Sequence, residues 1–468
     1  MAAAPMSPGF SRPQPTKAKI LIVGAGLGGL VLAALLEKAG IEYEVFERAK
    51  KVIPLGSAIS LGASIMPLFC QLGIEEVVKS KSKIILDCLQ HNDRALVPAH
   101  KIHMATKVLT IDQDTAGGGG VTIYCSDQKS YKGDILVGAD GAYSMVRQHL
   151  YEWLSSENRL PESDKELLPF TNICLVGTTN SMDPEEFPFL KREETHFMSI
   201  IGEAVPYSWV YFTVPDNRVC WMVVEHLEDK VYKPSSSSSP SSSTPAPDSQ
   251  NKINVEWVPG AAQQMCDQTR HFRFPDGTTI GDFIDRTDRD LISRVMLEEK
   301  MFETWYGGRI VLMGDACHKL HPSAGLGAVN AMHDAIILAS RLYGLMGQPE
   351  NGSADGTLHY TVEGIEEVLK AYQDERKPLA TISYEASQQM AQLLGRNWIS
   401  RMVRKILNTL PEWFMYGFFD RLMAYRPQVT FLPLPKQPGS IPPAPQTSLA
   451  LANAFDPQYE PKWTVSYK

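Results

Sequence analysis

The chain has 468 residues, of which 44% are hydrophobic and 21% charged, and its formal net charge is −8. This length exceeds what one simple core needs, so we expect two domains with accessory segments. The excess of acidic residues argues against a nucleic-acid interface, which needs clustered positive charge. The sequence has no run of about 18 uninterrupted apolar residues, so we expect no transmembrane helix. The N-terminal tail lacks the apolar core of a signal peptide, so we expect a cytoplasmic protein.

The first elements predict a dinucleotide-binding turn. An apolar strand over 19–23 runs into Gly24-x-Gly26-x-x-Gly29, which opens a helix. Glycines permit the tight turn and a close backbone approach, and the helix N-terminus favours a phosphate. Glu47 ends the next strand, where its carboxylate can accept hydrogen bonds from a ribose. This pattern alone does not separate NAD from FAD.

Short strands follow the first helices and extend the same domain. We expect them at 101–103, 107–112, 121–125 and 135–137. The last of these strands delivers Asp140-Gly141, and Ser144 and Arg147 lie on the following turn and helix.

The middle of the chain predicts a separate antiparallel sheet. Its strands are expected at 171–177, 195–201, 209–214 and 219–225. A Ser- and Pro-rich run over 235–247 cannot bury a core and predicts a disordered insertion in a loop. Helical patterns return from 280 to 302.

A second nucleotide-binding signature, Gly314-Asp315, follows another apolar strand late in the chain. Asp315 can accept a hydrogen bond from a ribityl hydroxyl; the alternative is that it only caps the next helix. Gly325 to Ala328 precede a long helix over about 326–345, whose N-terminus would stabilise the negative charge of reduced flavin. Two such signatures in one chain indicate a flavin dinucleotide.

Two further clusters have competing interpretations. His318 and His321 lie three residues apart beside Cys317, but no further ligand is evident, so we predict no metal site. The stretch 397–425 mixes aromatic residues with Arg and Lys. It either lies on a membrane surface, which would make the protein membrane-associated, or forms a helix pair packed against the flavin domain, and we favour the packed pair.

These motifs resemble a known family. The glycine turn, Asp140-Gly141 and Gly314-Asp315 together look like the FAD-dependent monooxygenases of the p-hydroxybenzoate-hydroxylase class. Phe46-Glu47-Arg48-Ala49, the segment 54–62 and Val205-Pro206-Tyr207-Ser208-Trp209-Val210 resemble its fungal branch, the epoxidases of meroterpenoid and indole-diterpene biosynthesis.

The resemblance implies an α/β fold, in which a Rossmann-like FAD-binding domain carries an inserted antiparallel β-sheet substrate domain and a helical C-terminus. The expected divisions are a disordered tail (1–17), the first part of the FAD-binding domain (18–168), the substrate domain (169–280) with its insertion near 234–250, the second part of the FAD-binding domain (281–360), and C-terminal helices with a Pro-rich tail (361–468).

The activity implied is epoxidation or hydroxylation of a prenylated or terpenoid small molecule, with FAD as cofactor, NAD(P)H as reductant and O2 activated at flavin C4a. A flavin-dependent reductase or dehydrogenase of a prenyl chain, and a flavin-fold protein that binds without catalysis, are the alternatives. The expected partners are the substrate, NAD(P)H and O2, with no nucleic acid.

The resemblance also assigns roles to individual residues. The expected cofactor contacts are Gly24, Gly26, Gly29, Glu47, Ala58, Asp140, Asp315, Gly327 and Ala328. Tyr207 matches a catalytic tyrosine of some relatives, although a tyrosine in a strand-rich domain also serves for packing. The chain departs from the family at one position. Relatives have an arginine that contacts FAD, but the corresponding 84–97 region is shortened here, and only Arg94 lies near the position of that arginine.

Overall fold

A computed structural model gives the positions of most of the chain. It describes residues 18–51, 59–80, 82, 97–114, 119–166, 168–202, 204–227, 260–346, 361–393, 395, 398–407, 409, 423–435 and 442–449. Ala58, Arg94, the predicted insertion at 235–247 and the aromatic residues between 410 and 422 lie outside the described residues.

A six-stranded sheet with the order β14-β15-β7-β1-β2-β3 forms the centre of the first domain. Its strands are β1 (Lys19–Val23), β2 (Glu42–Phe46), β3 (Ile102–His103), β7 (Ile135–Gly138), β14 (Tyr306–Gly307) and β15 (Ile310–Leu312). Only the β14–β15 pair is antiparallel. The central strands are almost wholly apolar and buried, as expected of parallel strands covered on both faces. Segments from both ends of the chain therefore share one core.

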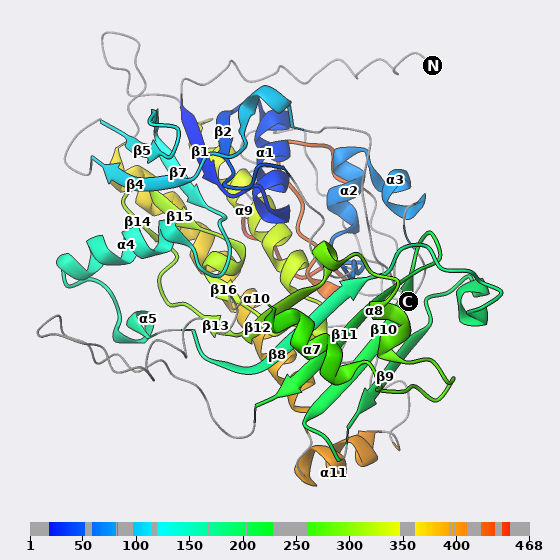
Figure 1. The fold of residues 1–468 in the computed structure, drawn as a ribbon. Coiled ribbons are helices and arrows are strands. Elements are labelled where there is room, and N and C mark those ends of the chain that lie inside the picture. Colours follow the sequence, from blue (N-terminus) through cyan, green and yellow to red (C-terminus); the bar gives the residue numbers. More distant parts are fainter. Residues whose placement is uncertain are drawn as a thin grey trace, which may run out of the picture.

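Helices cover this sheet. Helix α1 (Leu27–Ala39) ends at Gly40, whose φ of 74° gives the left-handed turn that commonly closes a helix. It packs beside α9 (Gly327–Met346), as Figure 1 shows. The other helices are α2 (Met66–Leu72), α3 (Glu75–Ser80), α4 (Met145–Ser156), α5 (Glu162–Lys165), α7 (Ala261–Thr269), α8 (Ile280–Ile284), α10 (Val362–Leu393) and α11 (Trp398–Leu407).

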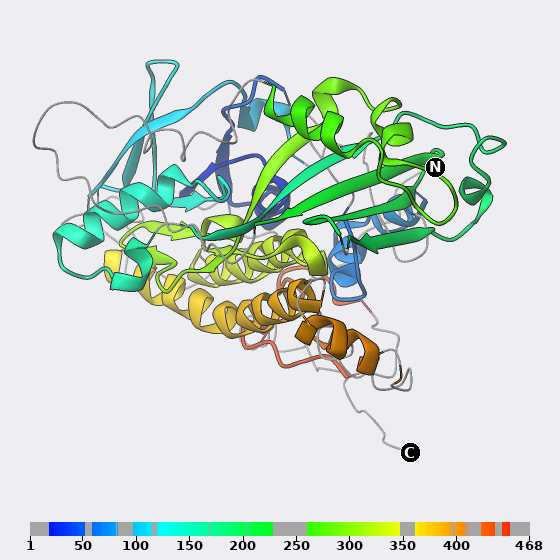
Figure 2. The same ribbon diagram turned by 60° about the horizontal axis from the view of Figure 1, so that its bottom comes forward.

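A five-stranded antiparallel sheet with the order β12-β8-β11-β10-β9 forms the second domain. Its strands are β8 (Phe170–Thr178), β9 (Phe197–Ile201), β10 (Tyr207–Val214), β11 (Arg218–His226) and β12 (Ser293–Glu298). One face buries large rings such as Tyr211 and Trp221 beneath α7 and α8, where Phe283 lies. The opposite face looks toward α9 and α10 (Figure 2). The expected α/β fold with an inserted antiparallel sheet is confirmed.

One segment differs from expectation. Helical patterns predicted a helix across 280–302, but only Ile280–Ile284 forms one, and Ser293–Glu298 is the strand β12. This strand pairs with β8, so the second sheet takes its last strand from beyond residue 280. Met, Leu and Glu favour helices locally, but pairing with an existing sheet edge outweighs that weak preference.

Two small sheets complete the described elements. One contains β4 (Val108–Gln113), β5 (Val121–Cys125) and β6 (Ser130–Gly133), and the other contains β13 (Lys300–Met301) and β16 (His318–Lys319). Short 3-10 turns lie at Ala99–Lys101, Pro188–Lys191, Arg289–Leu291, Gly314–Ala316 and Pro322–Ala324. Among the described helices, none has the length and apolar character that crossing a membrane requires.

Candidate flavin site

The carboxyl ends of four parallel strands lie in a row at one edge of the first sheet. Glu47 follows β2, Gly24 follows β1, Asp140 follows β7, and Asp315 lies just after β15. Backbone hydrogen bonds continue past the strand ends, since the Gly24 amide donates to Phe46 over 2.9 Å. Ligands of open α/β sheets bind at this edge, so the sheet gathers the predicted cofactor residues where a dinucleotide would lie.

The three predicted glycines divide into two roles. A Cβ on Gly24 would lie 2.3 Å from the Ala139 carbonyl oxygen, and one on Gly29 would lie 2.1 Å from the Gly24 oxygen. A Cβ on Gly26 would meet nothing within 4 Å. Gly26 is the N-cap of α1 and has no side-chain cap. Gly24 and Gly29 therefore allow close packing, whereas Gly26 leaves open space at a helix N-terminus, which fits a pyrophosphate.

Glu47 is held in place by the glycine turn itself. Its two carboxylate oxygens accept the backbone amides of Ala25, over 2.9 Å, and Ala49, over 2.8 Å. Each oxygen keeps a second lone pair, so both can still accept a ribose hydroxyl.

Asp140 faces the start of helix α4 rather than the open edge. Its carboxylate accepts the Ser144 hydroxyl over 2.5 Å and the amides of Met145 and Val146. Burial raises the pKa of Asp140, although these hydrogen bonds oppose the rise. The same turn positions Arg147, whose guanidinium donates to the Ala316 carbonyl over 2.9 Å. This hydrogen bond connects the Asp-Gly segment to the Gly-Asp loop.

The two nucleotide-binding motifs meet through helix α9. A Cβ on Gly28 would lie 3.2 Å from the Ala331 Cβ, and a Cβ on Gly314 would lie 3.1 Å from the same atom. Asp315, the residue after Gly314, is a third exposed and pairs with Lys319 over 2.6 Å. Gly28 and Gly314 therefore pack against the same residue of α9, although the two motifs lie far apart in the sequence.

The loop before α9 borders a cavity of about 270 Å³. Its lining residues are Ser60, Gly62, Ser64, Ser323, Ala324, Gly325, Leu326, Val329, Ala386, Met390 and Met423. Gly327 begins α9, and a Cβ there would meet nothing within 4 Å. The predicted contacts Gly327 and Ala328 are both partly accessible beside this cavity.

A buried ionic cluster, which we call the Asp334 cluster, supports the Gly-Asp motif. Asp334 on α9 accepts the Gly314 amide over 2.8 Å, His318 Nε2 over 2.7 Å and Arg376 Nε over 2.8 Å. Asp334 and Arg376 are fully buried. Burial by itself would raise the pKa of Asp334, but the positive charges beside it lower the pKa to about 2. The cluster thus pins the backbone of Gly314.

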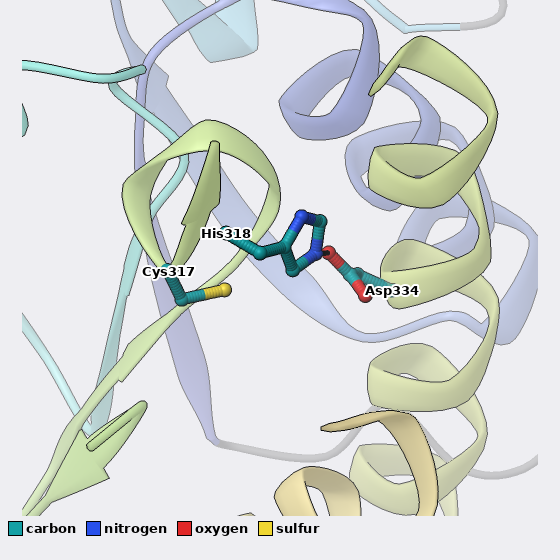
Figure 3. A group of neighbouring side chains, drawn as sticks. All are labelled: Cys317, His318 and Asp334. Carbon is teal, nitrogen blue, oxygen red and sulfur yellow. Dashed lines mark hydrogen bonds and ion pairs between the residues drawn. The ribbon is translucent and has the colours of Figure 1, made fainter. Parts of the chain in front are cut away.

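The same cluster includes the potential metal ligands Cys317, His318 and Asp334, whose ligand atoms lie within 4.8 Å of one another (Figure 3). Arg376 already neutralises Asp334, and burial raises the pKa of the Cys317 thiol well above its usual value. A cation would have to displace Arg376 from Asp334 and deprotonate this thiol. His321 points elsewhere, within 3.4 Å of Asn172 on the second sheet. The donor set fits an internal ion pair better than a metal centre.

Tyr207 lies away from these motifs. Its ring packs against Phe272, with ring centroids 5.4 Å apart, on the sheet face that α7 and α8 cover. Burial, together with Glu225 on the neighbouring strand, raises the pKa of Tyr207. The structure does not bring Tyr207 together with Asp315 or with the loop before α9.

Sequence reasoning overlooked several residues that the structure places beside the motifs. Asp334, Arg376, Asn172 and His226 lie far apart in the sequence and within no recognised pattern. Only Asp334 had an accessible signal, because a lone acid in a predominantly apolar helix predicts a buried partner.

Comparison with known proteins agrees with this geometry. The FAD binding domain family matches residues 17–87 and 278–387. The FAD-dependent monooxygenase paxM of Penicillium paxilli is 27% identical over 470 residues, covering 90% of this chain and 88% of the relative. The FAD-dependent monooxygenase atmM of Aspergillus flavus is 24% identical over 465 residues, again covering 90% of this chain and 88% of the relative.

Solved structures share the fold at lower identity. Klebsiella pneumoniae HpxO complexed with FAD and uric acid aligns with a TM-score of 0.59 and 17% identity, covering 88% of this chain and 98% of that one. The tetracycline destructase Tet(51) aligns with a TM-score of 0.56 and 14% identity, covering 84% and 95% of the two chains. With both flavin motifs on one sheet edge, a matching FAD binding domain and FAD-dependent monooxygenases similar along 90% of its length, this chain is an FAD-dependent monooxygenase.

Proposed function

We propose that this monooxygenase epoxidises or hydroxylates a prenylated or terpenoid intermediate of secondary metabolism, with NAD(P)H as reductant. The main support is the sheet face opposite α7 and α8. There the side chains of Val210, Phe212, Met222 and Val224 are apolar and only half-buried. Transfer of a hydrocarbon from water onto such a face is favourable, roughly in proportion to the apolar area removed from water.

The described residues can hold FAD along the strand ends. The open N-terminus of α1 at Gly26 would receive the pyrophosphate, Glu47 a ribose, and Asp315 the ribityl chain. Gly327 and Ala328 would lie at the flavin ring, where the α9 N-terminus favours negative charge. Bound FAD supplies the redox chemistry, and the protein supplies orientation and exclusion of water. Ala58 remains a proposed contact outside the described residues.

The proposal is tested by loading the purified protein with FAD and supplying NADPH, labelled O2 and a panel of prenylated aromatic and terpenoid compounds. We expect one oxygen atom from O2 in the product. A product without label, such as a saturated prenyl chain, would indicate a reductase. A protein that cannot be loaded with FAD would contradict both forms of catalysis.

We also propose a peripheral contact between α11 and an anionic lipid surface. Trp398, Met402 and Ile406 are 68%, 47% and 50% exposed, and their spacing of four residues places them on one stripe of the helix. Arg401 and Lys405 are exposed on the same helix. An apolar stripe with flanking cations is typical of helices that lie in a membrane interface.

Sedimentation with vesicles tests this contact. We expect binding to vesicles containing phosphatidylserine, weaker binding to pure phosphatidylcholine, and loss of binding in a Trp398→Ala/Met402→Ala variant. Equal sedimentation of the variant and the natural chain would contradict a role for α11.

A further inference from the structure

The sheet face toward α9 and α10 is mainly apolar and carries one hydrogen-bonded polar group, which we call the polar corner: Asn172 on β8, Ser208 on β10 and His226 on β11. The strand register explains the grouping, because Asn172 pairs directly with His226 and Ser208 pairs with the neighbouring Val224. Side chains at paired positions share a face of the sheet. The polar corner therefore lies on the same face as Phe212 and Met222.

The polar corner is hydrogen-bonded internally. Ser208 Oγ lies 2.7 Å from His226 Nε2, and His226 Nδ1 lies 3.0 Å from the side-chain amide of Asn172. That amide also lies 3.4 Å from Nε2 of His321. His321 belongs to the loop between the Gly-Asp motif and α9, and the following turn includes Ser323 on the wall of the 270 Å³ cavity. The polar corner thus joins the second sheet to this loop, residues 317–326, which we call the flavin loop.

His321 contacts the Asn172 side chain from the flavin loop. His321 is buried, and its pKa is lowered to about 4 by burial and by the nearby His226, so it is neutral at pH 7. Its Nδ1 lies 3.3 Å from the Ser323 amide, and its Nε2 lies 3.4 Å from the Asn172 amino group. A neutral imidazole has a single acceptor nitrogen, so it satisfies one of these two long contacts.

The Asn172 amide determines the hydrogen-bond directions in the polar corner. Its amino group donates to the Thr171 hydroxyl over 3.1 Å, and its oxygen faces His226 Nδ1 over 3.0 Å. In its uncharged form His226 therefore carries its proton on Nδ1, and its Nε2 accepts the Ser208 hydroxyl over 2.7 Å. The Ser208 oxygen keeps its lone pairs as acceptors, and His226 is the one side-chain partner of this hydroxyl among the described residues.

We propose that the Ser208 oxygen, oriented by His226 and Asn172, accepts a hydrogen bond from a single hydroxyl group of an otherwise hydrocarbon substrate that lies along Val210, Phe212 and Met222. This inference rests on the proposed function and narrows it. The substrate has one polar end and an apolar body, and the polar corner sets which part of that body reaches the flavin loop. A polar corner that only satisfies its own buried groups would show no preference among ligands.

A pair of probes tests the subsite without requiring turnover. FAD-loaded protein is titrated with farnesol and with the hydrocarbon that carries hydrogen in place of the farnesol hydroxyl, and the change in flavin absorbance reports each Kd. We expect farnesol to bind roughly 2- to 10-fold more tightly, which is the range that one hydrogen bond gives. Ser208→Ala should abolish the preference, and Ser208→Thr, which keeps the hydroxyl, should retain it.

The matched control is Ser199→Ala. Ser199 lies on the same sheet face, on β9 opposite Val210, but it is exposed and outside the polar corner. Its removal should leave the preference for farnesol unchanged. Thermal unfolding and the flavin spectrum of each variant verify that the fold and FAD binding are intact.

Three results would overturn the inference: equal affinities of the two probes in the natural chain, binding of neither probe, or a preference that survives Ser208→Ala. The test is separable from that of the proposed function. Protein that distinguishes the probes but incorporates no oxygen would refute monooxygenation and keep the subsite. Labelled product without any discrimination between the probes would support monooxygenation and refute the subsite.

Discussion

The Asp334 cluster and the polar corner both join distant parts of the chain beside the flavin loop, but they differ in charge and in exposure. The Asp334 carboxylate accepts three hydrogen bonds and faces a buried cation, and both side chains of the pair are 0% exposed. The polar corner contains no carboxylate, and its Asn172 and His226 are partly accessible. A buried charged cluster fixes backbone, whereas a partly accessible polar one remains available to a ligand.

The largest expected effect comes from breaking the charged Asp334 cluster. Asp334→Asn leaves Arg376 buried without its counter-ion, which costs about 3–5 kcal/mol of unfolding free energy. It also weakens the hydrogen bond that fixes Gly314, so we expect weaker FAD binding. Urea unfolding and FAD titration measure the two effects.

Glu375→Gln is the matched control for Asp334→Asn. Glu375 pairs with Arg341 over 2.7 Å and joins the same two helices, α9 and α10, without contacting Gly314. It should lower stability while leaving the Kd for FAD unchanged. Equal losses of FAD affinity in the two variants would show that the Asp334 cluster acts only through general stability.

The glycine turn offers the same contrast between closed and open positions. Gly24 has a φ of 107°, and a Cβ there would overlap the Ala139 carbonyl. Backbone strain and overpacking make Gly24→Ala cost about 3 kcal/mol of stability. Gly26→Ala should leave stability nearly unchanged and weaken FAD binding, because its Cβ would enter the open space where the pyrophosphate is expected. A stable Gly24→Ala protein, or unaltered FAD affinity in Gly26→Ala, would contradict this division.

Acid should act on the polar corner through His321. Its pKa lies near 4 in the folded protein, below the usual 6.5, so the unfolded chain takes up a proton first as the pH falls. This contribution to stability is complete above pH 6.5 and is lost as the pH falls toward 4. Between pH 7 and 5 the loss is about 2 kcal/mol.

Urea unfolding of the natural chain and of His321→Gln at pH 7 and pH 5 measures the contribution of His321 to this loss of stability. The natural chain should lose more stability between pH 7 and pH 5 than the variant does. His271→Gln, at an exposed position, should behave like the natural chain. Identical pH dependence of His321→Gln and the natural chain would exclude His321 as the source.

Local patterns predicted the parts of this molecule that local chemistry determines. The glycine turn, the motif acids Asp140 and Asp315, and the strands that precede them can be predicted from apolar runs and turn residues at short range. The strand β12 and the pair Asp334–Arg376 do not, because each depends on a partner more than 40 residues away. The polar corner was equally hidden, since it is assembled from three strands and a loop whose register the sequence does not specify.

The smallest expected effect concerns two adjacent residues on one strand. Tyr207 and Ser208 point to opposite faces of the sheet, as successive strand residues must. Tyr207 is predicted from family resemblance to be catalytic, but its ring packs against Phe272 on the covered face. We therefore expect Tyr207→Phe to lower stability by about 0.5–1 kcal/mol through the lost hydrogen bond to Glu225, and to change the rate of substrate oxidation less than about 2-fold. Steady-state oxidation with the natural chain and Ser208→Ala in parallel measures this. A 100-fold loss of rate in Tyr207→Phe with FAD still bound would mean that the covered face, and not the polar corner, lies over the reacting carbon.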